Sequence, residues 1–491
     1  MSLTDFNFLF WFLPTSLTAY FLAIRWCGIR VSKWVLLSFS IWFYSFWKVD
    51  FLPVFLFSVI INFTIVRTIS SPNSRPGQMI RRLVFFAGLA WNLGLLTYYK
   101  YSQFLFEQVS KIFNFEFQFH DYQLPLGISF FTFIQIAYLI QSYQSAEMKS
   151  TSFVDYAQLV TFFPHLIAGP IVTHDELVPQ FNDPGRLRFN PNNVAIGCFL
   201  VSLGLFKKLV LADSISEHSA LAFDQGAYDG MRAWISAGSY PAQLYFDFSG
   251  YVDIAIGVSK MFNFDLPQNF NSPFRATDIS DFWRRWHMTL SKFFTTYVYN
   301  PLAMHAGRRG GNTNVNGRIS IIRLVLIPTL ITFLLMGLWH GAGHKFLIFG
   351  LWHGVGIVIF RIWRTFRRPM PALLGWAITA LYVLIGFVFF RAPSLEVAFN
   401  VLDGMFSLHG FFGDPGKGHN LYFIDLTGDP GELWRIAMPT IAYTLALLPW
   451  NSQTLTRSFK PNIRFYLLTI GCLFSALVMI NRQIPFLYWQ F

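Results

Sequence analysis

Apolar runs long enough to cross a lipid bilayer recur along this 491-residue chain, and they limit its possible folds more than any other feature. A helix that spans the hydrocarbon core needs about 20 consecutive, largely apolar residues. Only 13% of the residues are charged, against roughly 25% in an ordinary soluble domain. Because lipid offers no hydrogen-bond partners to the backbone, such runs fold as helices. The sequence therefore predicts an all-α polytopic membrane protein.

About thirteen such stretches are present. They lie near 6–24, 33–47, 51–66, 82–99, 124–142, 153–172, 193–212, 233–260, 321–339, 345–363, 371–391, 436–450 and 464–481. The first has no basic segment before it and no small-residue cleavage site after it, so we expect a retained span rather than a signal peptide. We attribute the net charge of +12 to basic residues in cytoplasmic loops rather than to a nucleic-acid binding surface, and we expect no nucleic-acid partner. Three scattered cysteines predict neither a disulfide framework nor a metal site.

The distribution of lysine and arginine predicts the orientation of the chain in the membrane. Basic loops at 25–33 and 67–82 and a basic turn at 364–368 should be cytoplasmic, which puts the N-terminus, the loop 392–434 and the tail 482–491 outside. If all of the first ten stretches crossed the membrane, residue 364 would lie outside, whereas its basic neighbours indicate the cytoplasmic side. An odd number of these ten stretches therefore does not cross. The best candidate is 153–172, because Pro164 and Pro170 break a helix. His165 in this stretch suits non-helical backbone that lines a cavity.

Two copies of Leu-Trp-His-Gly, at 338–341 and 351–354, each place a histidine in an apolar run. An ionisable residue at membrane depth is costly and usually faces a protein interior or a water-filled cavity. His340 and His353 are thirteen positions apart, which does not place them on one helical face. We therefore expect them on different helices that converge on one cavity. The glycine after each histidine should allow another chain or a ligand to approach closely.

The segment 275–318 is basic and aromatic, and its centre reads DFWRRWH. If it is helical, Asp281 can pair with Arg285 four residues later, and Trp283 shares a face with His287. The segment is typical of an interfacial or re-entrant helix on the cytoplasmic side. The cations of Arg284 and Arg285 suit a phosphorylated carrier such as coenzyme A.

Two carboxylates lie in the apolar stretch YFDFSGYVD, and they should not face lipid. Asp247 and the nearby Tyr251 are candidates for lining the acceptor side. The alternative is a structural ion pair between a buried carboxylate and Arg284 or Arg285, which we favour for Asp253.

Several long motifs resemble those of the membrane-bound O-acyltransferases, in particular the bacterial branch with alginate O-acetylation and teichoic-acid D-alanylation proteins. They are PLGISFFTF (125–133), FFPHLIAGPI (162–171), QLYFDFSGYVDIAIG (243–257), FWRRWHMTLS (282–291), GLWHGAG and GLWHGVG. The resemblance implies one domain over 1–491, with N-terminal helices (1–120), a motif-bearing core (121–360) and C-terminal helices (361–491). It implies a ring of roughly 11–12 tilted helices, with re-entrant and interfacial helices, around a central catalytic funnel.

The resemblance also implies an activity and its residues. His340 matches the essential histidine, and His353 matches a second histidine that either orients a substrate or caps a helix. His287 and Trp339 are expected near the donor or acceptor. The tail PFLYWQF resembles a C-terminal motif in which a tyrosine, here Tyr488, is proposed to carry the acyl group as an ester.

The function implied is acetyl transfer from acetyl-CoA to an extracytoplasmic polysaccharide such as alginate, in the inner membrane of a bacterium. A histidine suits the role of base for the hydroxyl proton. Lipid and a periplasmic acetyltransferase are the expected partners, and no bound cofactor or metal is expected. His344, four residues from His340, has a metal-ligand spacing, but the intervening glycines disfavour a regular helix.

Two alternatives remain open at this level. The first is D-alanyl transfer from a carrier protein to teichoic acid, and the acceptor could equally be cellulose or peptidoglycan. The second belongs to another class: a polar-solute transporter in which the histidines relay protons. Transporters often contain repeated half-structures with paired broken helices, and the short LWHG duplication is too local to count as one.

Overall fold

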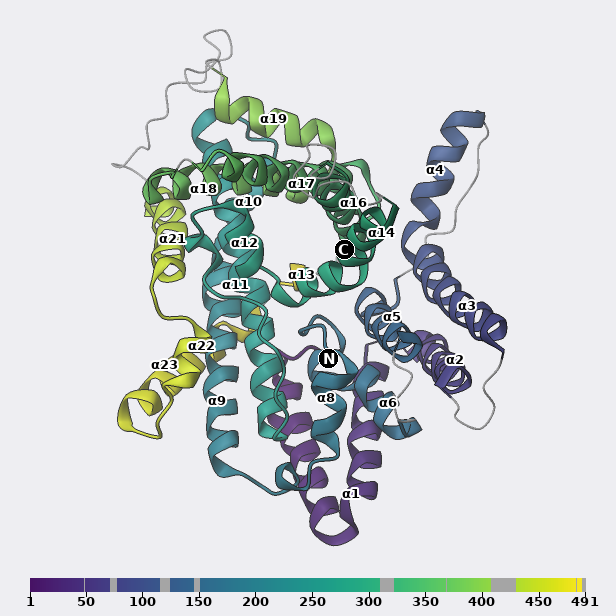
Figure 1. The fold of residues 1–491 in the computed structure, drawn as a ribbon. Helices are drawn as coiled ribbons and strands as arrows, with labels where there is room; N and C mark the ends of the chain where they lie inside the picture. The colour runs from purple at the N-terminus through teal and green to yellow at the C-terminus, as the bar shows by residue number, and fades with distance from the viewer. Residues whose placement is uncertain are drawn as a thin grey trace. The chain divides into compact units, whose positions relative to one another are not determined.

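The computed structural model describes residues 1–47, 49–70, 77–114, 124–144, 151–309, 322–367, 369–407, 430–482 and 484–487. All regular secondary structure in these ranges is helical, which confirms the all-α class (Figure 1). The α-helices are α1 (Leu13–Ser45), α2 (Leu52–Ser70), α3 (Gln78–Leu96), α4 (Ser102–Phe113), α5 (Ile128–Gln144), α6 (Phe153–Thr161), α7 (Phe163–Leu166), α8 (His174–Phe181), α9 (Pro191–Leu205), α10 (Asp213–Phe223), α11 (Gly230–Met261), α12 (Ile279–Arg285), α13 (Met288–Phe294), α14 (Asn300–Arg309), α16 (Ile327–His340), α17 (His344–Thr365), α18 (Ala372–Arg391), α19 (Leu395–Phe406), α21 (Pro430–Leu447), α22 (Ser452–Arg457) and α23 (Ile463–Met479).

Seven helical stretches in the described ranges are long and apolar enough to span a membrane. They are Phe8–Ser45, Val49–Ser70, Gln78–Phe113, Pro191–Phe223, His344–Thr365, Ala372–Arg391 and Ile463–Arg482. Other predicted stretches form shorter helices, such as α5 with 17 residues and α16 with 14. The chain is therefore a multi-pass membrane protein. A ring of helices around a funnel stays a prediction.

The described residues form two compact units. The first comprises Met1–Leu203, Tyr251–Gln268 and Phe459–Gly471, and the second comprises Gly204–Gly250, Asn269–Ser458 and Cys472–Phe491. In the first unit, α1 breaks at Gly28, whose φ of 80° lies in the left-handed region that glycine adopts freely. This break falls inside the predicted loop at 25–33. The organisation of the whole chain as one domain stays a prediction.

The stretch 153–172 is broken, as its prolines predicted. Helix α6 ends at Thr161, α7 has only four residues, and the next helix begins at His174. A Cβ on Gly169 would lie 3.0 Å from the backbone carbonyl carbon of His165, so glycine is needed for this tight turn. His165 itself is buried, and its ring centre lies 5.7 Å from that of Phe162.

In the second unit, α16, α17 and α18 pack side by side (Figure 1). Only three residues, Gly341–Gly343, join α16 to α17. The two helices approach closely at a pair of glycines, because a Cβ on Gly337 would lie 2.9 Å from the Cα of Gly350. Small residues at such a crossing bring helix backbones together in a membrane protein. This crossing determines where the two motif histidines lie.

Candidate active site

The two motif histidines lie on different helices of the second unit, as the sequence predicted. His340 is the last residue of α16, and His353 lies in the middle of α17. Both are buried, with 3% and 1% of their surface exposed. Because His353 is far from both ends of α17, the alternative that it caps a helix is wrong.

Aromatic rings surround both histidines. The ring centre of Phe349 lies 5.7 Å from that of His340 and 4.7 Å from that of His353, so this one side chain contacts both. Phe390 adds a further contact to His340 at 5.0 Å, and Trp339 another at 4.9 Å. A largely apolar environment disfavours the charged form of an imidazole. The arrangement therefore favours histidines that act as neutral groups.

The hydrogen bond of His353 determines which of its nitrogens carries the proton. The indole Nε1 of Trp283 donates to Nδ1 of His353 over 3.3 Å. An indole N–H only donates, so Nδ1 carries the lone pair and the neutral ring has its proton on Nε2. Among the residues that the structure describes, none pairs with this Nε2. His353 is thus suited to donate a hydrogen bond to a substrate oxygen.

The glycines beside these histidines are packed against the protein itself. The ring of Phe346 occupies the space where a Cβ of Gly341 would lie, and a Cβ on Gly354 would lie 3.0 Å from Cβ of Phe333. A Cβ on Gly386 of α18 would lie 2.5 Å from Nε2 of His353. The close approach predicted at the motif glycines is therefore made by side chains of this chain.

The WRRWH segment is not one continuous helix, and here the sequence-based interpretation was wrong. Helix α12 ends at Arg285, and His287 has a φ of 43° before α13 begins. Trp283 and His287 consequently do not share a helical face. The predicted ion pair is present, because Nε of Arg285 lies 2.8 Å from Asp281. Arg284 also pairs with Asp281, and its side chain is 65% exposed and accessible to a ligand.

Asn269 holds His287 in one tautomer. The Oδ1 of Asn269 accepts hydrogen bonds from the backbone N–H and the hydroxyl of Thr289, so this atom is an acceptor. His287 Nδ1, 3.1 Å away, must therefore donate to it, which leaves the lone pair on Nε2. Burial lowers the pKa of His287 to about 3, so the ring stays neutral. Its ring centre lies 6.0 Å from that of Trp339, the neighbour of His340.

Asp247 has a different partner from the one considered in the sequence. Its Oδ1 lies 2.7 Å from Nζ of Lys208, which also contacts Asp213 at 2.7 Å. The arginines Arg284 and Arg285 pair with Asp281 instead, so the alternative of a link to them does not hold for Asp247. The structural pairing favoured for Asp253 stays a prediction. Lys208 could have been noticed, because it is an ionisable residue in the apolar stretch 193–212.

His165 and Tyr251 belong to the first unit, where both are buried. Tyr488 lies outside the described residues. Their assigned roles stay predictions. The roles of Phe349, Phe390 and Asn269 were missed, because neither an isolated phenylalanine nor an isolated asparagine carries a signal of its site.

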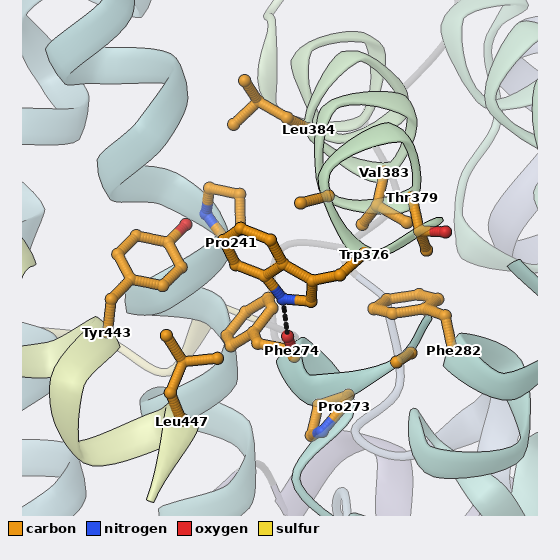
Figure 2. A pocket seen from close by; sticks show the side chains of 12 residues that line it. Pro241, Pro273, Phe274, Phe282, Trp376, Thr379, Val383, Leu384, Tyr443 and Leu447 are labelled. Carbon is orange, nitrogen blue, oxygen red and sulfur yellow. Dashed lines mark hydrogen bonds between the residues drawn. The ribbon is translucent and has the colours of Figure 1, made fainter. Parts of the chain in front are cut away.

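An apolar hollow lies on the other side of α12 (Figure 2). It has a volume of about 70 Å³. Its lining residues are Pro241, Pro273, Phe274, Ala276, Phe282, Trp376, Thr379, Ala380, Val383, Leu384, Tyr443 and Leu447. The Trp376 Nε1 and Tyr443 hydroxyl both donate to backbone carbonyls. Phe282 stacks towards His353 with ring centres 6.5 Å apart, so this ring separates the hollow from the histidines. Among the described residues that line the hollow, none is a histidine or a carboxylate.

Comparison with known proteins gives a consistent picture. The chain matches the model of the MBOAT, membrane-bound O-acyltransferase family, over residues 9–397. It is 37% identical to the peptidoglycan O-acetyltransferase of Helicobacter pylori, over 99% of this chain and 96% of that protein. It is also 37% identical to the probable alginate O-acetylase AlgI of Pseudomonas aeruginosa, over 82% of this chain and 74% of that protein. The teichoic acid D-alanyltransferase of Bacillus subtilis is 26% identical, over 45% of this chain and 55% of that protein.

The family match covers most of the chain and includes the elements that carry the histidine cluster, α12, α16 and α17. It agrees with the helical membrane fold. It also decides between an enzyme and a solute transporter. The chain belongs to the membrane-bound O-acyltransferase family and is an O-acyltransferase.

Proposed function

We propose that this protein transfers acetyl groups from cytoplasmic acetyl-CoA towards an extracytoplasmic glycan, with His340 as the base. The observation that carries this proposal is the position of His340 at the end of α16, buried among Trp339, Phe349 and Phe390 in a family that acylates hydroxyl groups. A neutral imidazole near a thioester and a hydroxyl can remove the proton that leaves the attacking oxygen.

In the chemical step a carbon–oxygen bond forms and the carbon–sulfur bond of the thioester breaks, and one proton moves from the hydroxyl to the thiolate. The hydroxyl oxygen attacks the thioester carbonyl carbon as His340 takes the hydroxyl proton. The tetrahedral intermediate collapses with cleavage of the carbon–sulfur bond, and the proton passes to the leaving thiolate of coenzyme A. His353, with its proton on Nε2, is suited to donate a hydrogen bond to the developing oxyanion.

The donor is assigned to the α12 side of the site. The side chains of Arg284 and Arg285 are 65% and 32% exposed, so both guanidinium groups are accessible to the phosphates of coenzyme A. Arginine guanidinium groups bind phosphate through paired hydrogen bonds. Trp283, which bonds His353, then connects the donor region to the reacting centre.

The first acceptor in this proposal is the phenol of Tyr488, which becomes an acetyl ester and passes the group to a periplasmic acetyltransferase or directly to the glycan. For the final acceptor we propose peptidoglycan, because the Helicobacter pylori relative aligns over nearly its whole length. Alginate is the next candidate, and D-alanyl transfer to teichoic acid follows. The location would be the bacterial inner membrane.

The experiment tests two acyl donors and the glycan acceptor with the wild-type protein and with the variant Tyr488→Phe. Purified protein receives acetyl-CoA or a D-alanyl carrier thioester, and thiol release is measured. Ester-linked acetyl is then measured on peptidoglycan from cells that express each variant. We expect acetyl-CoA to be consumed, and acetyl on peptidoglycan to be lost in Tyr488→Phe because the variant has no hydroxyl to acylate.

Each result has its own meaning. Thiol release from the D-alanyl donor alone would contradict acetyl transfer, and acetyl on alginate but not on peptidoglycan would contradict the proposed acceptor. Unchanged peptidoglycan acetylation in Tyr488→Phe would contradict the relay through the tail.

Removing the hydrogen bond from Trp283 to His353 should have a smaller effect on the rate of acetyl transfer. Trp283→Phe removes the indole donor to His353 and keeps an aromatic ring, and a net hydrogen bond contributes about 1 kcal/mol, or about fivefold in rate. We expect the rate of acetyl transfer to fall by about this factor. The matched control is Trp376→Phe, which removes an indole bond to the carbonyl of Phe274 without contacting a histidine. Equal rates for the two variants would contradict a role for the Trp283 bond.

A further inference from the structure

A buried lysine between two aspartates joins the consecutive segments η5 and α10 to α11 in the second unit. Lys208 lies in the π-helical segment η5 (Phe206–Ala212), Asp213 begins α10, and Asp247 lies in α11. The side chains of Lys208 and Asp247 are only 4% and 1% exposed. Such charges are costly to bury unless every donor and acceptor is paired.

The cluster is completed by the C-terminal segment 484–487. Lys208 Nζ donates to Asp213 at 2.7 Å, to Asp247 at 2.7 Å and to the carbonyl of Ile484 at 2.9 Å, which uses all three of its N–H groups. The other oxygen of Asp213 accepts from the backbone N–H of Ile484 at 3.2 Å. The other oxygen of Asp247 accepts from the backbone N–H of Leu487 at 3.0 Å. Each carboxylate therefore bridges Lys208 and the tail.

A series of ring contacts leads from this segment to the histidine cluster. Phe486 is buried, and its ring centre lies 5.9 Å from that of Phe248, the neighbour of Asp247. Phe248 in turn lies 4.8 Å from His287, which lies 6.0 Å from Trp339. The anchored segment therefore lies on the side of the site that His287 occupies.

We propose that Lys208, Asp213 and Asp247 are positioning residues that hold the segment 484–487, so that the next residue, Tyr488, is presented to His340 for acylation. This inference rests on the proposed role of Tyr488. Three well-packed helices need no buried charge for stability, since apolar residues of similar volume usually stabilise as well. What the charges supply is a set of hydrogen bonds to the backbone of the segment 484–487.

The test uses the full-length protein with acetyl-CoA and the double variant Lys208→Met/Asp247→Leu, which replaces the ion pair by apolar side chains. Trypsin cleaves after Arg482 and releases residues 483–491, in which Tyr488 has the only hydroxyl group. Acetyl on this peptide therefore measures acylation of Tyr488. We expect its formation to be about 10²-fold slower in the double variant, as for other misplaced reacting groups.

A second measurement separates positioning from general damage. Hydrogen exchange at the amides of Ile484 and Leu487 should be slow in wild type and fast in the double variant. A synthetic peptide of residues 483–491, added in excess, should be acetylated by both proteins, because the histidine cluster is intact and only the tethered tail is misplaced. Asp247→Asn keeps an oxygen for the N–H of Leu487 and should retain most of the acylation.

The matched control removes another buried lysine–aspartate pair, Lys33→Met/Asp155→Leu, from the first unit. It should acylate Tyr488 at the wild-type rate. The positioning proposal is overturned if Lys208→Met/Asp247→Leu acylates Tyr488 normally, or if acylation falls while the tail amides stay protected. If wild type itself carries no acetyl on Tyr488, the relay is wrong. In that case the exchange measurement still decides whether the cluster holds the tail.

Discussion

Replacing His340 with alanine is expected to abolish acetyl transfer while the protein remains folded. His340 is the buried histidine at the end of α16, in contact with the rings of Phe349 and Phe390. A general base contributes typically about 10²–10⁴-fold to a rate, and alanine has no group that can take the hydroxyl proton. Release of coenzyme A from acetyl-CoA measures the loss. His340→Gln, which fills the same space without a basic nitrogen, should be equally inactive.

Two other histidines serve as controls for this result. His344→Ala changes an exposed residue at the start of α17 and should keep full activity, which would also argue against a metal pair of His340 and His344. His218→Ala removes a buried imidazole from α10 and should lower the melting temperature more than the rate. A folded His340→Ala protein that releases coenzyme A at the wild-type rate would contradict the assignment of the base.

Features that depend on neighbouring residues were predictable from the sequence. The break within 153–172 follows from its prolines, since a helix cannot continue through Phe162–Pro164 without losing a backbone hydrogen bond. The pair Asp281–Arg285 follows from the spacing of four on α12. Separate helices for His340 and His353 follow from their spacing and from the glycines between them. Each of these inferences depends only on residues that lie close together in the sequence.

Features that depend on distant residues were not predictable. Trp283 bonds His353 seventy positions later, and the partner of Asp247 is Lys208 rather than an arginine. A buried charge indicates that a partner exists, but periodicity does not tell which of several cations reaches it. The left-handed backbone at His287 was missed for a similar reason. Asn269, which precedes His287 by 18 residues, supplies the hydrogen bonds that stabilise the start of α13.

Replacing Gly337 with alanine, at the crossing of α16 and α17, is the second change that we expect to have a large effect on activity. A Cβ at this position would lie 2.9 Å from Cα and 3.0 Å from N of Gly350, and closer still to the carbonyl oxygen of Phe346. These are backbone atoms that cannot rotate away, so the helices must separate. Because His340 follows Gly337 by three residues and His353 follows Gly350 by three, the separation moves both histidines. We expect coenzyme A release to fall by about 10²-fold, as for a displacement of about 1 Å.

The same substitution should lower thermal stability, since overpacking costs about 1–3 kcal/mol. Gly238→Ala in α11 is the matched control, because a Cβ there meets no atom within 4 Å and alanine favours the helix. Its melting temperature should stay equal or rise, with full activity. If Gly337→Ala kept both its melting temperature and its rate, the close approach of α16 and α17 would not be what aligns the histidines. A normal melting temperature with a strongly reduced rate would instead locate the effect in the geometry of His340 and His353.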